Sequence, residues 1–181
     1  MAVLVEGISV VVRAHAIVEH YAGGWKAFRA DCPNDTLCAD GTLVRVGFMD
    51  PRDAKQFVER LTQKGLAYVQ DGEAVDLVLA DQQRGLSAPC KWAELGRLPA
   101  PGHTSASVAA CRMAGTEEDA LMTPDGWTYT DSLSARFGST ETDSTAERLE
   151  FLRQENGADV YRDTETGEEV FVGRTPPDSD A

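Results

Sequence analysis

The chain has 181 residues, of which 42% are apolar and 26% are charged, and its formal net charge is -13. These proportions are those of a folded globular protein, and a chain of this length buries roughly 70% of its unfolded surface without disulfides or metals. They exclude wholesale disorder, and since no apolar run approaches the roughly 20 residues of a membrane helix, no membrane span is predicted.

The negative charge is concentrated in the back third of the chain. Residues 1–113 contain 13 acidic and 12 basic residues, whereas residues 114–181 contain 17 and 5. Because nucleic-acid binding needs clustered Lys and Arg to displace counterions, DNA and RNA are disfavoured as partners. The acidic part either keeps the protein soluble or meets a basic protein partner.

The cysteines and the start of the chain indicate a cytoplasmic protein. The first residues, MAVLVE, lack the basic start and long apolar core of a secretory signal. Cys32, Cys38, Cys90 and Cys111 are therefore expected to be reduced thiols. The C-x5-C spacing of the first two is wider than in common zinc sites, and nothing nearby completes four ligands, so neither a metal nor another cofactor is predicted.

The first predicted elements alternate between strand and helix. Ile8–Val12 is a β-branched run typical of a strand that is covered on both faces. One or two helical turns are expected over residues 14–21, and Gly23-Gly24 interrupts them before WKAFRA at 25–30. Residues 42–49, TLVRVGFM, predict another strand.

Residues 47–65, GFMDPRDAKQFVERLTQKG, have the local signals of a helix. Asp50 suits the N-cap, Pro51 the first helical position and Asp53 the first turn. Gly65 suits the left-handed position after the helix. Asp50 and Asp53 are therefore interpreted as structural and not as catalytic residues. Four apolar residues at helical spacing form the predicted buried face: Ala54, Phe57, Val58 and Leu61.

Residues 66–81 contain two apolar runs on either side of Asp71-Gly72, which predicts a hairpin. Residues 1–80 are thus predicted to run strand, helix, strand, strand, helix, then strand or hairpin. This order resembles a ferredoxin-like split β-α-β arrangement, and the likeness is one of topology only.

Residues 81–107 are rich in polar residues, Gly and Pro, and a long loop is expected there, with one short helix in PCKWAEL at 89–95. Long loops in compact domains often carry function, and Arg and Trp frequently anchor interfaces. The candidate binding residues are therefore taken from this loop: Asp81, Gln82, Arg84, Cys90 and Trp92.

The back half is predicted to be rich in antiparallel strands. SVAACRM at 107–113 predicts a strand, and the alternation of apolar and polar residues over 127–137 predicts a half-solvated one. GSTETD, residues 138–143, is expected to be a linker. Ser144 and Glu147 form a capping box for a helix that ends at Gly157.

A terminal hairpin around residues 164–167 and a disordered tail at 175–181 complete the predicted chain. The predicted fold is α+β. It comprises a ferredoxin-like unit over 1–80, the long loop over 81–107 and an antiparallel β-rich unit with one helix and the terminal hairpin over 108–174. The same elements are also compatible with a single domain.

The motifs of common enzyme families are absent from the sequence. His15 and His20 are five residues apart and do not share a helix face as a metal pair would. Cys90 is the best placed of the thiols, but no signature locates a basic partner for it. Nucleophile elbows and phosphate-binding glycine loops are missing as well. No catalytic residue is predicted, and an enzyme is disfavoured.

The hypothesis that these observations favour is an acidic cytosolic protein-interaction module, an inhibitor or immunity-type protein that binds a basic partner. The alternative is a small-molecule-binding or uncharacterised enzymatic domain with a pocket near residues 81–92. A third hypothesis is a structural subunit of a larger assembly. The sequence leaves the oligomeric state open.

Overall fold

A computed structural model describes residues 1–117, 119–137, 149–155, 158–164, 167 and 169–173. The chain divides into two compact units, Met1–Ser139 and Thr140–Ala181. The fold is α+β with several antiparallel sheets, as the sequence predicts. Within the described residues, no helix is both long enough and apolar enough to cross a membrane.

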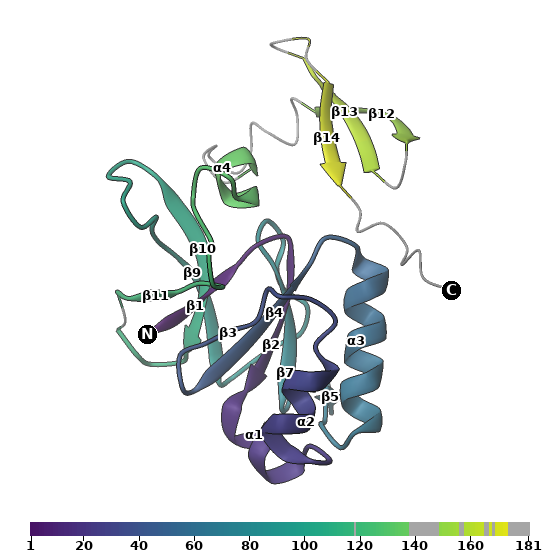
Figure 1. Ribbon diagram of the computed structural model, residues 1–181, viewed down its shortest axis with the longest axis vertical. Helices are drawn as coiled ribbons and strands as arrows, with labels where there is room; N and C mark the ends of the chain where they lie inside the picture. The colour runs from purple at the N-terminus through teal and green to yellow at the C-terminus, as the bar shows by residue number, and fades with distance from the viewer. Residues whose placement is uncertain (118, 138–148, 156–157, 165–166, 168, 174–181) are drawn as a thin grey trace. The chain divides into compact units, whose positions relative to one another are not determined.

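The first unit contains a five-stranded antiparallel sheet in the order β3-β4-β2-β7-β8 (Figure 1). The central strand β2 pairs with β4 on one side and with β7 on the other. The predicted strand at Ile8–Val12 is confirmed, and it is covered on both faces as expected. The strands are β2 (Ile8–Arg13), β3 (Cys38–Ala39), β4 (Leu43–Phe48), β7 (Leu77–Asp81) and β8 (Gly85–Leu86).

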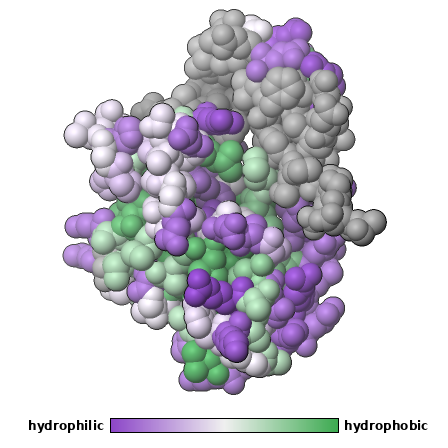
Figure 2. All heavy atoms as spheres, in the orientation of Figure 1, coloured by the Kyte–Doolittle hydropathy of each residue, from purple (hydrophilic) through white to green (hydrophobic). Residues whose placement is uncertain are grey.

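Three helices, α1 (Ala14–His20), α2 (Gly24–Asp31) and α3 (Pro51–Gln63), pack on one face of this sheet. Gly23 and Gly24 have positive φ angles of 86° and 62°, which separates α1 from α2 as the sequence predicts. The outer side of α3 carries hydrophilic residues (Figure 2). The three helices therefore bury their apolar side chains against this face of the sheet and form one hydrophobic core with it.

The predicted helix α3 is confirmed in its boundaries, cap and buried face. The Asp50 Oδ1 atom accepts a hydrogen bond from the backbone N–H of Arg52 at 2.8 Å, and Gly65 has a φ of 113°. Ala54, Phe57, Val58 and Leu61 are all buried.

A tight hairpin follows α3. Strands β5 (Val69–Gln70) and β6 (Glu73–Ala74) are joined by Asp71 and Gly72, whose φ angles are 52° and 81°. Two consecutive positive φ angles are typical of a type I′ turn, which suits the twist of a two-residue hairpin. The hairpin predicted at this Asp-Gly pair is confirmed.

A second, four-stranded sheet has the order β11-β1-β10-β9. The strand predicted at 107–113 is β10 (Ser107–Met113), and it is confirmed. The other strands are β1 (Ala2–Val5), β9 (Ala93–Pro99) and β11 (Leu121–Met122). Apolar side chains of the two sheets meet in a layer that includes Val3, Val11, Leu43, Val78 and Cys111.

The long loop expected over residues 81–107 is shorter than predicted, and the expected helix in PCKWAEL is wrong. Residues 85–86 form β8 and Ala93–Pro99 form β9. Strand β9 pairs with β10 in one unbroken register, from Ala93 opposite Met113 to Pro99 opposite Ser107. This pairing is a tertiary contact that overrides the local composition.

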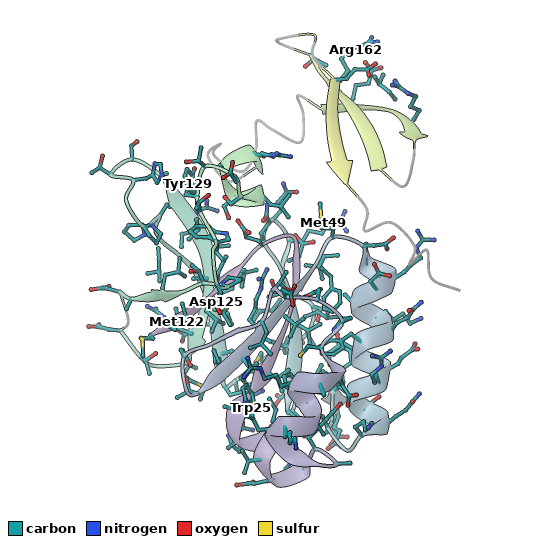
Figure 3. All side chains as sticks on the ribbon, viewed as in Figure 1. Trp25, Met49, Met122, Asp125, Tyr129 and Arg162 are labelled. Carbon is teal, nitrogen blue, oxygen red and sulfur yellow. The ribbon has the colours of Figure 1, made fainter. Side chains whose placement is uncertain are left out.

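The half-solvated strand expected over 127–137 is also wrong, because this segment consists of turns followed by α4 (Leu133–Phe137). Trp127 and Tyr129 pack against Leu4 and Val108 of the four-stranded sheet. Figure 3 labels Tyr129. The Ser132 hydroxyl accepts the backbone N–H of Ala135 at 3.0 Å, which favours a helix start over a strand.

The described residues of the second unit form a three-stranded antiparallel sheet, β12 (Leu149–Glu155), β13 (Ala158–Asp163) and β14 (Glu169–Gly173). The terminal hairpin is confirmed. The helix expected to end at Gly157 is wrong, because Leu149–Glu155 pairs as a strand with β13, and this pairing overrides the helical spacing. The capping box at 144–147, the linker at 138–143 and the tail at 175–181 lie outside the described residues.

Candidate functional site

The predicted binding residues Asp81, Gln82 and Arg84 lie at the turn between β7 and β8. The Asp81 Oδ1 atom accepts the backbone N–H groups of Gln83 and Arg84 at 2.8 and 3.0 Å. Gln82 donates its backbone N–H to the Gly7 carbonyl at 3.0 Å and accepts the Gly7 N–H on Oε1 at 2.8 Å. Asp81 and Gln82 therefore shape the turn and anchor it to the start of β2, whereas Arg84 is exposed.

Trp92 and Cys90 lie at the other end of β2. The Trp92 indole N–H donates to the Ala74 carbonyl at 3.1 Å, and the guanidinium carbon of Arg13 lies 5.8 Å from the ring centroid. This distance is that of a cation–π contact. Cys90 is half-buried against the apolar layer between the sheets.

The predicted site is therefore divided between two ends of the five-stranded sheet. Asp81 pairs with Ile8, the first residue of β2, whereas Arg13, which contacts Trp92, is the last. Five residue steps along a strand span roughly 17 Å. The structure does not bring Asp81, Gln82 and Arg84 to Cys90 and Trp92.

Arg13 adds a cation to the Trp92 end of the sheet. Its Nη1 donates to the Val75 carbonyl at 3.4 Å, while its Nε and the Oδ2 atom of Asp40 are buried without a hydrogen-bond partner among the described residues. Arg13 lies opposite Leu43 in the sheet, and the Leu43 carbonyl accepts the Asp40 N–H at 3.1 Å. An unsatisfied donor and acceptor at one end of the sheet suit a small polar molecule.

His20 and Asp76 form an imidazole–carboxylate pair near Arg13. The Asp76 Oδ2 atom accepts the Ala67 N–H at 2.8 Å and lies 3.5 Å from His20 Nδ1, and the Asp76 carbonyl accepts the Arg13 N–H at 2.9 Å. The Asp76 side chain is 5% exposed and the His20 side chain 50%. The buried Asp76 carboxylate thus lies on the Nδ1 side of the imidazole, and Oε2 of Glu19 lies 3.9 Å from Nε2.

Within the described residues, however, no hydroxyl or thiol donates a hydrogen bond to the His20 imidazole, so the pair lacks the nucleophile of a catalytic triad. Sequence reasoning missed the pair because His20 and Asp76 are far apart in the chain and no motif links them. It missed Arg13 because this residue lies between strand β2 and helix α1, where no sequence motif indicates a binding residue.

A buried polar network lies where the chain passes from β1 to β2. The Glu6 carboxylate accepts the backbone N–H of Ser134 at 2.9 Å, its hydroxyl at 2.6 Å and the Trp127 indole N–H at 3.0 Å. The Glu6 carbonyl accepts Nη2 of Arg45 at 3.1 Å, and Arg45 Nε donates to the Ser9 hydroxyl at 2.9 Å. The network is enclosed, so it holds α4 and Trp127 in place. Its sequence signal is an acid inside the apolar run VLVEGISVVV.

All four cysteines are free thiols. Burial raises the pKa of Cys111 to about 12 and that of Cys32 to about 11, and it also raises the pKa of Cys38. Because the thiolate is the nucleophilic form, these three groups are poor nucleophiles at neutral pH.

The two units differ in charge. The 42 residues of Thr140–Ala181 contain 12 acidic and 4 basic side chains, a net charge of -8, whereas Met1–Ser139 contains 18 and 13, a net charge of -5. On the second unit Arg153 binds Glu169 through two hydrogen bonds, at 3.0 and 2.9 Å, which lowers the pKa of that carboxyl. Glu150 and Arg162 are exposed there. Figure 3 labels Arg162.

Within the described residues, no group of three or more His, Cys, Asp or Glu side chains is arranged to hold a metal ion. No family model, curated protein or solved structure matches the chain. Geometry and charge are therefore the basis for assigning a function.

Proposed function

We propose that this protein is an acidic interaction module of the inhibitor or immunity type, which binds a basic protein partner. The observation that carries the proposal is the charge of the second unit, with 12 acidic against 4 basic residues in Thr140–Ala181. Charge of one sign on a small compact unit attracts an oppositely charged partner over a Debye length of roughly 8 Å at physiological salt. It favours rapid association and selects against acidic partners.

The proposal includes the ferredoxin-like arrangement of the front half. The strand order β7-β2-β4-β3, the antiparallel pairing of each neighbouring pair and the helices that follow β2 and β4 support it. A cytoplasmic location is part of the same proposal. The free thiols, two of them buried, fit a reducing compartment.

Affinity capture with the full chain tests the partner. We expect a basic protein to co-purify with the wild type, and its affinity to fall as the salt concentration rises. Neutralising Glu150, Asp159 and Asp163 as Gln or Asn should weaken the complex about ten-fold or more, because the second unit loses three negative charges and each charge pair with the partner contributes up to about 1 kcal/mol.

A matched control variant carries three neutralised acids of the first unit, Asp35, Glu59 and Glu117, and so has the same net charge. It should bind nearly as well as the wild type. Binding that is insensitive to salt, equal weakening by the two variants, or the failure of any basic protein to co-purify would each refute the proposed function.

A second candidate function, small-molecule binding, is favoured by two buried atoms without a hydrogen-bond partner among the described residues, Nε of Arg13, which lies beside Trp92, and Oδ2 of Asp40. A screen of small zwitterionic and amide compounds by thermal shift and indole fluorescence tests it. Binding should be lost in Asp40→Asn and kept in Asp35→Asn. If no compound stabilises the wild type, this second candidate is wrong.

A further inference from the structure

Strand β9 is an outer strand of the four-stranded sheet. It pairs with β10 along all seven of its residues, Ala93–Pro99, and no other strand of the described residues pairs with it (Figure 1). The other outer strands of the two sheets, β3, β8 and β11, have two residues each. Among the described strands of the first unit, β9 is therefore the long outer edge.

An outer strand directs half of its backbone N–H and C=O groups away from its neighbour, and a second extended chain can pair with them. The residues Glu94, Gly96, Arg97 and Pro99 of β9 are exposed. Pro99 lacks an N–H, so it limits the length available for pairing to Ala93–Leu98.

The devices that usually protect such an edge are weak in β9. Its register with β10 contains no bulge. Both charged side chains contact β10: the Glu94 Oε2 atom lies 3.5 Å from Arg112 Nη2, and Arg97 donates to the Ser107 hydroxyl and carbonyl at 2.9 and 3.0 Å. These contacts of Glu94 and Arg97 lie across the hairpin.

Gly96 lies at the centre of this edge. A Cβ atom added there would meet no other atom within 4 Å, so the fold does not require a glycine for packing. Glycine weakens a strand interior, and it is common where another backbone approaches closely. Its position thus suits the arrival of a second chain.

We propose that β9 binds an extended segment of a partner polypeptide by strand addition. Backbone hydrogen bonds would supply the affinity, and alternate side chains the specificity. The Glu94 side chain is 50% exposed, so a basic residue is favoured opposite it, and apolar residues are favoured opposite the half-buried Leu95 and Leu98. A basic segment also complements the net charge of -5 of Met1–Ser139. This surface lies on the first unit.

The test uses a displayed library of 12-residue peptides selected against the full chain. The selected peptides should carry a basic residue opposite Glu94, an apolar residue next to it opposite Leu95, and a second apolar residue three positions further on, opposite Leu98. In amide exchange by NMR, alternate amides between Glu94 and Leu98 should exchange rapidly in the free protein and slowly in the complex. Slowed exchange at another surface only, or the selection of no peptide, overturns the proposal.

Two N-methylated versions of the selected peptide provide the matched control. Methylation of the amides along the edge that pairs with β9 should weaken binding at least about ten-fold, because several hydrogen bonds are lost together. Methylation along the opposite edge should leave the affinity within about two-fold. Equal effects of the two versions overturn strand addition.

The same peptide should bind equally well to the variant in which Glu150, Asp159 and Asp163 are neutralised, since those residues belong to the second unit. If no peptide binds β9 but a basic protein still binds in a salt-dependent way, strand addition is wrong and the proposed function stands. If a peptide binds β9 but no basic protein co-purifies, the proposed function is wrong and strand addition stands.

Discussion

At the scale of single residues, buried polar groups decide which substitutions the first unit tolerates. Arg45 is 3% exposed, and it donates hydrogen bonds to the Ser9 hydroxyl and to the carbonyls of Glu6 and Thr36. Burial lowers the pKa of its guanidinium. A buried charge with fixed donors tolerates little displacement, because lost hydrogen bonds leave it uncompensated.

Gly47→Ala tests this network. A Cβ at residue 47 would come within 2.6 Å of the Arg45 guanidinium carbon, so the guanidinium must move. We expect a loss of about 1 to 3 kcal/mol in the free energy of unfolding, measured by urea titration. Gly96→Ala, which meets no atom within 4 Å, is the control and should change stability by less than about 0.5 kcal/mol. Equal losses of stability in the two variants would contradict the inference that Gly47 leaves room for the Arg45 guanidinium.

The thiols give a second prediction at this scale. Cys111 is fully buried and Cys38 is 5% exposed, and burial raises the pKa of both. At pH 8 an alkylating reagent should modify them only at the rate of unfolding, whereas Cys90, which is half-buried, should react earlier. Mass spectrometry of digests taken at successive times measures the order in which the cysteines are alkylated, and in denaturant this difference between them should disappear. Rapid native labelling of Cys111 would show that the layer between the sheets is open.

At the scale of elements, one carboxylate joins α4 to the strands. Glu6 accepts three hydrogen bonds, from Ser134 and Trp127. Glu6→Ala should lower the free energy of unfolding by roughly 2 to 4 kcal/mol, because buried donors lose their acceptor. Glu6→Gln keeps one acceptor and should cost less. Red-shifted Trp127 fluorescence should accompany the loss, and Glu94→Ala, at an exposed site, should have little effect.

A second contact joins α2 to α3. The Tyr21 hydroxyl donates to Asp31 Oδ2 at 2.7 Å, and Lys64 Nζ lies 3.5 Å from the same oxygen. The hydrogen bond from Tyr21 and the charge of Lys64 lower the pKa of Asp31. Burial, together with the same hydrogen bond, raises the pKa of Tyr21 above its ordinary value of 10.0.

The lowered pKa of Asp31 and the raised pKa of Tyr21 predict that this contact loses its stabilising effect at opposite ends of the pH range. A lowered pKa means that the Asp31 carboxylate stabilises the fold above its unfolded pKa and that this stabilisation is lost as pH falls through the folded pKa. Asp31→Asn should therefore cost about 1 kcal/mol at pH 7 and less in acid. The contribution of Tyr21 is present below its unfolded pKa and is lost as pH rises through the folded pKa. Urea titrations across pH measure both, and a constant difference for Asp31→Asn would contradict the first.

At the scale of the whole molecule, the net charge of -13 should oppose folding at low salt. Like charges repel one another more strongly in the compact chain, and salt screens them. The melting temperature should therefore rise when sodium chloride is added. The variant neutralised at Glu150, Asp159 and Asp163 should show a smaller rise, and a fall in the wild type would contradict this prediction.

The fold was predictable where local and tertiary preferences agree. Helix α3 has its cap at Asp50, its apolar face and its stop at Gly65 within one short segment. The Asp71-Gly72 turn and the Ile8–Val12 strand are local in the same sense. The segment Leu149–Glu155 has helical spacing but pairs as a strand, because its cross-strand partners lie outside any local window.

At the candidate site, Trp92 was named from the sequence, but Arg13, which contacts it, was not. Arg84 and Trp92 were predicted as candidate binding residues of one loop, whereas the structure places Arg13 over the indole. The choice followed chain proximity, and the sheet places the turn after β7 at the opposite end of β2 from Trp92. Sequence distance is a poor guide to contact when antiparallel strands reverse the chain.

The sequence by itself determined the α+β class, the cap and face of α3, the tight hairpin and the excess of acid toward the C-terminus, since these depend on neighbouring residues or on composition. Only the tertiary structure decided that Ala93–Pro99 becomes an outer strand, that Glu6 is enclosed by Trp127 and Ser134, and that His20 meets Asp76. Those outcomes depend on pairing between distant segments, which costs chain entropy and is stabilised only when the sheets and their apolar layers form together.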